Sequence, residues 1–101
     1  MPVIHTHVSV STTPAQRDAL KAAYGKAISA VPGKSEHWLM CPFEDNMPIY
    51  FAGDNTKPAA YVEVNVFGSS VPGSAWEKLT EQIMAALEPV SYTHLTLPTS
   101  D

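Results

Sequence analysis

The sequence predicts an α/β domain built from two β-α-β units. Two segments, residues 3–10 and 60–67, alternate their side chains with the period of a strand. Each is followed by a segment of helical periodicity that opens on a helix-capping sequence. The order strand, helix, strand occurs once from residue 3 to residue 43 and begins again near residue 59. A chain of 101 residues leaves room for only one such domain.

The first strand covers residues 3–10 and has two different faces. One face carries Ile4, Thr6, Val8 and Val10, and the other carries Val3, His5, His7 and Ser9. Because side chains alternate across a strand, we expect the first set to face the core and the two histidines to lie on the opposite face.

A helix follows over roughly residues 14–31. Thr13, Pro14 and Gln16 form a capping box with a proline in the first turn. Apolar residues then recur at three- and four-residue steps, as Leu20, Ala23, Tyr24, Ala27, Ile28 and Val31. The helix is expected to end at Pro32-Gly33.

The middle of the chain predicts two weaker strands. Residues 37–43 form a short apolar run typical of a second strand, weakened toward its end by Pro42. Residues 48–51 are long enough only for a short edge strand. Residues 53–58 have the composition of a loop.

The second unit opens with the clearest strand, residues 60–67, whose even positions are all small or branched apolar residues. We expect this even face to be buried under both helices, with Glu63 and Asn65 on the opposite face. After a flexible connection, Ser74 and Glu77 form a second capping box. The helix that it opens carries on one side Trp76, Leu79, Ile83, Ala86 and Leu87, and Pro89 ends it.

The last eleven residues fit neither the strand period nor the helix period. Residues 91–101 are similar to a peptide that recurs where sequencing-adapter DNA is translated, so we expect a non-native or irregular tail after a domain of residues 1–90. The tail is not expected to form the closing strand of the second unit, because Pro98 lacks a backbone donor.

Charge and apolar content exclude several classes of partner. Ten Asp and Glu against six Lys and Arg give a formal net charge of −4, so neither nucleic acid nor a membrane surface is an expected partner. Apolar runs fall well short of a membrane span, and no signal peptide is recognised, so we expect a cytoplasmic protein. Cys41 is the single cysteine, which excludes an internal disulfide.

Pro2 and Lys34 are the candidate chemical groups. Removal of Met1 would leave Pro2 as a secondary amine held at the start of a strand, and burial would make it a usable general base. Lys34 follows the first helix, where a cation can hold an anionic substrate or serve only as a surface lysine at a helix end. Trp38 and Phe67 could wall an aromatic pocket, although aromatic residues in strands more often belong to the core.

His5 and His7 share a strand face, and Glu63 and Asn65 share a face of the other long strand. Metal binding is conceivable, but two histidines with no fixed third ligand form a pattern of low specificity. A polar sheet face lining the interior of an oligomer is favoured. We therefore expect no metal and no cofactor, and the sequence holds no phosphate-binding glycine loop.

The chain resembles the macrophage migration inhibitory factor family of the tautomerase superfamily. The resemblance runs from Pro2 to about Leu87 and depends on the order and spacing of several short pieces. These are Met1-Pro2 before a strand, Gly33-Lys34 after the first helix, Phe51-Ala52-Gly53 with Pro58 beyond it, Phe67-Gly68 at a strand end, and the capped second helix.

This resemblance implies one four-stranded mixed sheet with two helices on one face, assembled as a homotrimer. It implies a keto-enol tautomerase of the phenylpyruvate or dopachrome type, with Pro2 as general base and Lys34 on the substrate carboxylate. Phe67 would contribute a backbone amide, and Trp38 falls where the family has an aromatic residue from a neighbouring subunit. The family's C-terminal strand has no counterpart here, so the second unit is expected to lack its native closing strand.

Two other functions remain open at this point. The first is a cytokine-like or host-modulating binding protein, released without a signal peptide. The second is a related isomerase acting on a carboxymuconate-type acid. For a tautomerase, the expected partner is a small aromatic or unsaturated keto acid.

Overall fold

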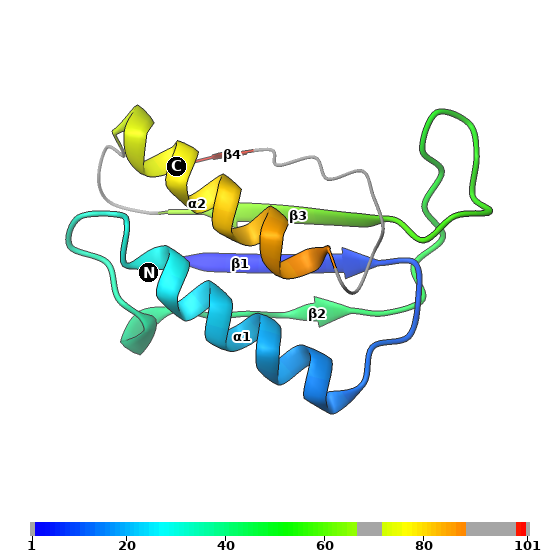
Figure 1. The fold of residues 1–101 in the computed structure, drawn as a ribbon, viewed down its shortest axis with the longest axis horizontal. Coiled ribbons are helices and arrows are strands. Elements are labelled where there is room, and N and C mark those ends of the chain that lie inside the picture. Colours follow the sequence, from blue (N-terminus) through cyan, green and yellow to red (C-terminus); the bar gives the residue numbers. More distant parts are fainter. Residues whose placement is uncertain (1, 67–71, 89–98, 101) are drawn as a thin grey trace.

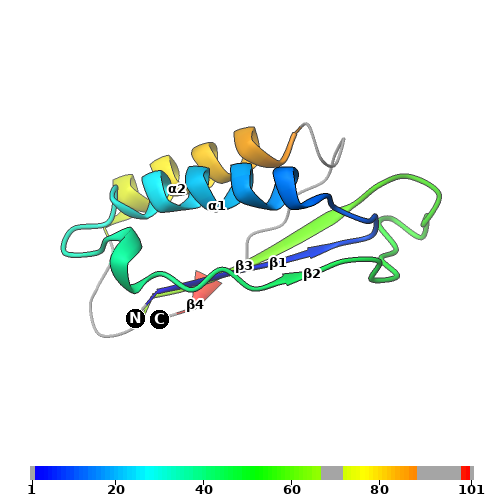
Figure 2. The ribbon, with the colours of Figure 1, turned by 90° about the horizontal axis from the view of Figure 1, so that it is seen from below.

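A computed structural model describes residues 2–66, 72–88 and 99–100 of the chain. It contains four strands, β1 (Val3–Val8), β2 (Phe43–Glu44), β3 (Ala60–Asn65) and β4 (Thr99–Ser100). Two α-helices, α1 (Pro14–Ile28) and α2 (Gly73–Leu87), lie side by side on one face of the sheet, and a short 3-10 helix, η1 (Glu36–Trp38), precedes β2 (Figures 1 and 2). In the described part of the chain, no helix is both long and apolar enough to cross a membrane.

The sheet is mixed and has the strand order β2-β1-β3-β4. Within each unit the two strands are parallel, β2 beside β1 and β4 beside β3, as a β-α-β connection requires. The central pair, β1 and β3, is antiparallel. The predicted fold class, two β-α-β units in one mixed sheet with both helices on one face, is therefore confirmed.

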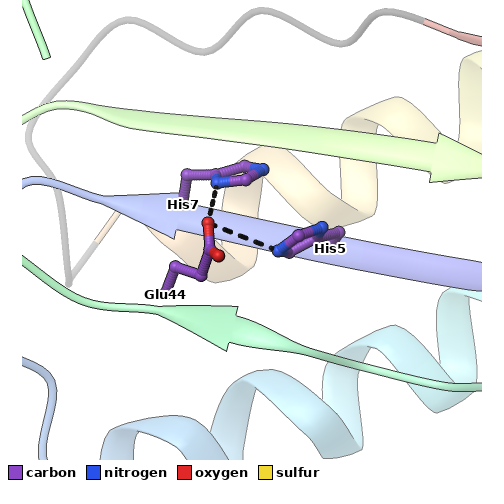
Figure 3. Close-up of side chains that lie close together, drawn as sticks. All are labelled: His5, His7 and Glu44. Atoms are coloured by element: carbon purple, nitrogen blue, oxygen red, sulfur yellow. Dashed lines mark ion pairs between the residues drawn. The ribbon is translucent and has the colours of Figure 1, made fainter. Parts of the chain in front are cut away.

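The core lies between the sheet and the two helices, and the predicted faces of both long strands are confirmed. Ile4 and Val8 of β1 and Val62 and Val64 of β3 are at most 1% exposed. Ile4, Val62 and Val64 pack with residues of both helices and their flanks: Leu20, Tyr24, Ala27, Ile28, Val31, Ala75, Leu79, Ile83 and Leu87. The histidines of β1 lie on the other face of the sheet, beside Glu44 (Figure 3).

One polar pair is enclosed in this apolar core. The hydroxyl groups of Thr6 and Tyr24 lie 2.7 Å apart in a buried hydrogen bond between β1 and α1. Burial raises the pKa of Tyr24 to about 12, while the hydrogen bond to Thr6 acts in the opposite direction. Each hydroxyl satisfies the other, so neither is buried without a partner.

Helix α1 begins as predicted and ends earlier. The capping box is present in both directions, between Thr13 and Gln16. The α-helix ends at Ile28 rather than near residue 31, because the next amides donate to carbonyls three residues back, as in Ala30 to Ala27 at 3.0 Å. Val31 is nevertheless buried, so the apolar stripe continues past the last α-helical turn.

The predicted capping box of α2 is wrong. The N-cap is Pro72, which makes no side-chain hydrogen bond, and Ser74 lies inside the first helical turn. The helix then keeps its predicted apolar side, except that Ala75 takes the buried position and Trp76 is only partly buried. The backbone of Ala75 and Trp76 donates to the carbonyl of Pro72, which satisfies two amides of the first turn.

The second strand is shorter than the sequence predicts. Residues 36–38 form η1, and only Phe43–Glu44 pair as a strand, at Thr6 and His7. Pro42 has no backbone donor and offers only its carbonyl, which accepts from the Thr6 amide at 3.0 Å. Before it, a single bridge joins Val3 and Met40.

The predicted edge strand at residues 48–51 is also wrong. Phe51 and Asp54 face each other in an isolated antiparallel bridge, joined by hydrogen bonds of 2.9 and 3.0 Å. Between them, Ala52 and Gly53 have φ angles of 53° and 79°. Two residues of positive φ close a tight hairpin turn, so the chain reverses here instead of extending along the sheet.

Within the described residues, the closing strand of the second unit consists of the two residues of β4, which agrees with the prediction that the native closing strand is missing. In β4, Thr99 and Ser100 lie opposite Val64 and Asn65 of β3. The tail is predicted not to form the closing strand, and in the described part of the chain it contributes to the edge of β3 the two residues that follow Pro98. Residues 89–98 lie outside the described part, and the non-native origin of residues 91–101 stays a prediction.

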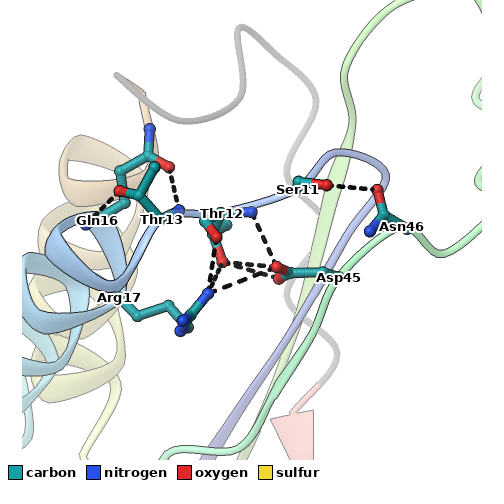
Figure 4. Close-up of polar contacts among 7 residues, drawn as sticks. All are labelled: Ser11, Thr12, Thr13, Gln16, Arg17, Asp45 and Asn46. Atoms are coloured by element: carbon teal, nitrogen blue, oxygen red, sulfur yellow. Dashed lines mark hydrogen bonds and ion pairs between the residues drawn. The ribbon is translucent and has the colours of Figure 1, made fainter.

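Asp45 fastens the end of β2 to the start of α1 (Figure 4). Its carboxylate accepts hydrogen bonds from the Thr12 amide at 2.8 Å and from the Thr12 hydroxyl at 2.9 Å. Arg17 donates to the carbonyl of Thr12 at 2.7 Å and lies 3.6 Å from Asp45. The Thr12 amide, helped by its hydroxyl and by Arg17, holds the pKa of Asp45 below its ordinary value.

We expect Asp45→Asn to destabilise the protein by about 1–2 kcal/mol at pH 7, because the backbone amide of Thr12 loses the ionised acceptor of its hydrogen bond. A lowered pKa means that the stabilisation is complete above the ordinary value near 4 and is lost as pH falls through the folded-state value. Urea-unfolding midpoints of parent and variant should therefore converge as the pH falls below about 4. Asp18→Asn on the exposed side of α1 is the control, and a difference that is constant with pH would contradict the role of Asp45.

Candidate functional site

Pro2 is buried at the start of β1. Its carbonyl accepts a hydrogen bond from the Met40 amide at 3.1 Å, and the next residue, Val3, forms the parallel bridge to Met40. On the other side, Val3 pairs with Asn65 near the end of β3. Pro2 is therefore held at one end of the sheet, between the segment that leads into β2 and the end of β3.

Lys34 is placed at the same end of the sheet by the turn after α1. Gly33 has a φ of 80°, a left-handed conformation that a glycine adopts without strain. The Lys34 amide donates to the Val31 carbonyl at 3.1 Å, which fixes the backbone where the chain turns toward η1. Figures 1 and 2 both show this turn, η1 and the first residue of β1 gathered at one end of the molecule.

Trp38 ends η1 and is not a core residue. It is 61% exposed, and its ring meets the His37 ring edge-on with centroids 4.7 Å apart. The next residue but one, Met40, is also exposed, at 53%. An exposed tryptophan at the end of the sheet that holds Pro2 fits a binding role better than the core role that strand aromatics usually have.

Phe67, the fourth predicted site residue, lies outside the described residues. Val66 before it is buried, and Asn65 pairs with Val3. The structure therefore brings the backbone of Pro2 and the segment from Lys34 to Trp38 to one end of the sheet, and the described part of β3 runs toward that end.

Cys41 lies in the segment between η1 and β2 and is partly buried. Burial raises the pKa of its thiol to about 11, and the negative charge of Glu36 acts in the same direction. A thiol with a raised pKa is a poor nucleophile at neutral pH. Cys41 is therefore a packing residue next to the core, as its apolar surroundings in the sequence indicate.

A cavity of about 410 Å³ lies at the opposite end of the molecule. Its walls come from three loops, with residues Ser9, Val10, Asn46, Met47, Pro48, Ile49, Asn55, Thr56, Lys57 and Pro58. Pro2, Lys34 and Trp38 do not line it. Lys57 is the one basic residue among its lining residues.

A second group of chemical side chains lies on the open face of the sheet. His5, His7 and Glu44 offer ligand atoms that all lie within 4.8 Å of one another. The sequence pattern pointed to His5, His7 and Glu63 but missed Glu44, because only the pairing of β2 with β1 brings Glu44 beside His7. Nothing in the sequence shows which residue of β2 lies opposite His7.

Comparison with known proteins gives matches among solved structures. No protein-family model matches the chain, and no curated protein matches it. The chain is similar to a macrophage migration inhibitory factor (MIF) of Leishmania major, MIF2, with 33% identity, a TM-score of 0.83, and 99% of this chain and 89% of that chain covered.

Two further structures agree in fold. The MIF of Toxoplasma gondii has 25% identity and a TM-score of 0.84, over 98% of this chain and 88% of that chain. A MIF homologue from Prochlorococcus marinus has 22% identity and a TM-score of 0.81, over 98% of this chain and 87% of that chain.

Trp38→Ala is expected to change the free energy of unfolding by no more than about 0.5 kcal/mol, because the side chain is mostly exposed. Leu79→Ala, at a position 1% exposed, should cost about 2–5 kcal/mol and serves as the comparison. Urea unfolding of both variants at one protein concentration measures the difference. Equal losses of unfolding free energy in the two variants would show that Trp38 is a core residue and not part of the candidate site.

Proposed function

Because this chain belongs to the macrophage migration inhibitory factor family, we propose that it is a cofactor-independent keto-enol tautomerase with Pro2 as general base. Its substrate would be a small aromatic or unsaturated keto acid of the phenylpyruvate type. The observation that carries the proposal is the burial of Pro2 at the start of β1, with its carbonyl held by Met40. These contacts, together with the strand that follows, hold the ring of Pro2 in its position.

The base in this proposal is the ring nitrogen of Pro2 after Met1 has been removed. An ordinary α-amine has a pKa near 8 and is mostly protonated at neutral pH. Burial disfavours the charged form of an amine and so favours the neutral form that can accept a proton. The rigid ring and the hydrogen bond from Met40 to the Pro2 carbonyl keep that nitrogen at one position relative to the sheet.

The reaction is a proton transfer next to a carbonyl group. Pro2 takes a proton from the carbon beside the carbonyl, and the electron pair of the broken C–H bond forms the enolate. Lys34 holds the carboxylate of the substrate, and the backbone amide of Phe67 donates to the developing enolate oxygen. The proton then returns from Pro2 to the enolate oxygen, which gives the enol and restores the free amine.

We propose further that the protein works as a homotrimer, with each site between two subunits. Trp38 would line the pocket of a neighbouring subunit. The support is its exposure of 61% near Met40, which is also exposed, since an exposed large aromatic side chain is typical of a contact surface. In this proposed trimer, Lys34 and Trp38 of one chain would belong to two different substrate sites, although they are close together in the sequence.

Pro2→Gly should lower kcat/KM for phenylpyruvate by about 100-fold, the scale of general-base catalysis, because a primary amine without the ring is a less well positioned base. A second variant with one alanine inserted between Met1 and Pro2 should lose activity equally, since the ring nitrogen becomes an amide. Circular dichroism controls for folding. Full turnover by either variant would rule out Pro2 as the base, and an inactive parent protein would favour the binding-protein function instead.

Lys34→Ala should raise KM for a carboxylated substrate about 10-fold or more while kcat changes little, because a charge-assisted contact to the substrate is lost. Lys26→Ala, an exposed lysine in the last turn of α1, is the matched control. Thermal midpoints should be close to the parent value for both variants. A large loss of stability with a normal KM in Lys34→Ala would assign Lys34 a structural role.

A further inference from the structure

Four charged or titratable side chains meet on the face of the sheet that the helices leave open. His5 and His7 come from β1, Glu44 from β2 and Glu63 from β3. The strand register brings them together, because His7 pairs with Glu44 and His5 pairs with Glu63. Figure 3 shows both imidazole rings turned toward the carboxylate of Glu44. This polar group is distinct from the Pro2 end of the sheet and is not used by the proposed reaction.

Glu63 fixes the hydrogen position on the His7 ring. Nε2 of His7 lies 2.8 Å from Oε1 of Glu63 in a hydrogen bond. An ionised carboxylate only accepts hydrogen bonds, so Nε2 of His7 carries the hydrogen. In the neutral ring the other nitrogen, Nδ1, then presents a lone pair. A histidine whose outer nitrogen donates to a carboxylate is the usual arrangement of a metal-ligating histidine.

Nδ1 of His7 is in an unusual position. The side chain is only 8% exposed, and Nδ1 lies 2.7 Å from Oε2 of Glu44. This nitrogen nevertheless makes no hydrogen bond within the described residues, so the carboxylate oxygen lies off the direction that an N–H group would need. Two lone-pair atoms at such a distance repel each other unless a positive charge is shared between them. A coordinated cation satisfies both atoms without the directional demand of a hydrogen bond.

His5 supplies a third ligand to the same point. Its Nε2 lies 3.6 Å from Oε2 of Glu44, so both histidines approach one carboxylate oxygen. Ligand atoms about 2.0–2.2 Å from a tetrahedral zinc ion are about 3.3 Å apart. The two separations from Oε2 of Glu44, 2.7 Å to His7 and 3.6 Å to His5, lie on either side of that value. The Glu44 side chain is 49% exposed, so it is not locked by packing on every side.

We propose that His5 Nε2, His7 Nδ1 and Glu44 bind one Zn²⁺ ion on the open face of the sheet, with Glu63 orienting His7. Two imidazoles and one carboxylate suit zinc and neighbouring transition metals, whereas Mg²⁺ and Ca²⁺ require oxygen ligands throughout. The rings of His5 and His7 are 4.1 Å apart, a separation at which two imidazolium charges would repel and two neutral, metal-bound rings would not. Three protein ligands leave the fourth position to water.

The ion would have a structural effect on the short edge strand β2. β2 pairs with β1 over only two residues, and Glu44 is one of them. A metal shared by β1 and β2 adds a cross-link at that point, and it stabilises the folded chain because the ligands are not assembled in the unfolded chain. Zinc should therefore stabilise the protein independently of any tautomerase activity.

Competition of the full chain with a chromophoric chelator for ZnCl₂ tests the proposal. We expect one Zn²⁺ per chain and a rise in thermal midpoint of about 5 °C at saturating zinc. Glu44→Gln and His5→Gln should each weaken zinc binding at least about 10-fold, and Glu63→Gln, which removes the orienting partner, by about 10-fold or more. His7 is too buried for a clean substitution, so the partly exposed Glu44 and His5 carry the test.

His37→Gln and Glu81→Gln are matched controls at exposed positions away from the sheet face, and both should bind zinc like the parent. Co²⁺ added in place of zinc should give the visible absorption of a tetrahedral site, lost in Glu44→Gln. No binding by the parent would overturn the proposal. Equal weakening by His37→Gln would overturn it too, as would parent-like binding by Glu44→Gln or His5→Gln.

Discussion

The antiparallel pairing of β1 with β3 holds the rest of this structure in place. Six residues of β1 pair with six of β3, from Val3 opposite Asn65 to Val8 opposite Ala60. This register puts the apolar residues of both strands under the helices and the histidines of β1 on the open face. A shift by one residue would exchange the two faces, exposing the core and burying three titratable side chains without partners. The burial of the core face therefore also determines where the polar chemistry lies.

The edge strand β2 depends on this central pair and on a few polar contacts. It is only two residues long, and it is held by the Met40 amide on the Pro2 carbonyl at one end and by the Asp45 carboxylate on Thr12 at the other. The same short segment carries Glu44, the carboxylate beside His7. Contacts that hold β2 in place thus also position Pro2 and Glu44, one of the proposed zinc ligands. Loss of the contacts at either end of β2 should therefore disturb both candidate sites.

The two candidate sites depend on different features of the sheet. At the end of the sheet, a buried proline is gathered with the turn that carries Lys34 and with η1, which ends at the exposed Trp38. On the open face, the register of three strands brings two imidazoles and two carboxylates together. The first site depends on where strands begin and end, and the second on which residues face each other across the sheet.

Much of this protein is determined by local sequence. The period of two in β1 and β3, the capping box at Thr13 and the apolar stripe of α1 follow from backbone geometry and burial, which a single sequence displays directly. Tertiary structure decided the lengths of the edge elements. Pro42 has no backbone donor for the strand predicted there. Thr99 pairs with β3 along the edge that faces away from β1. It alone brought Glu44 to His7, because strand pairing depends on packing across the whole sheet and leaves no local mark in the chain.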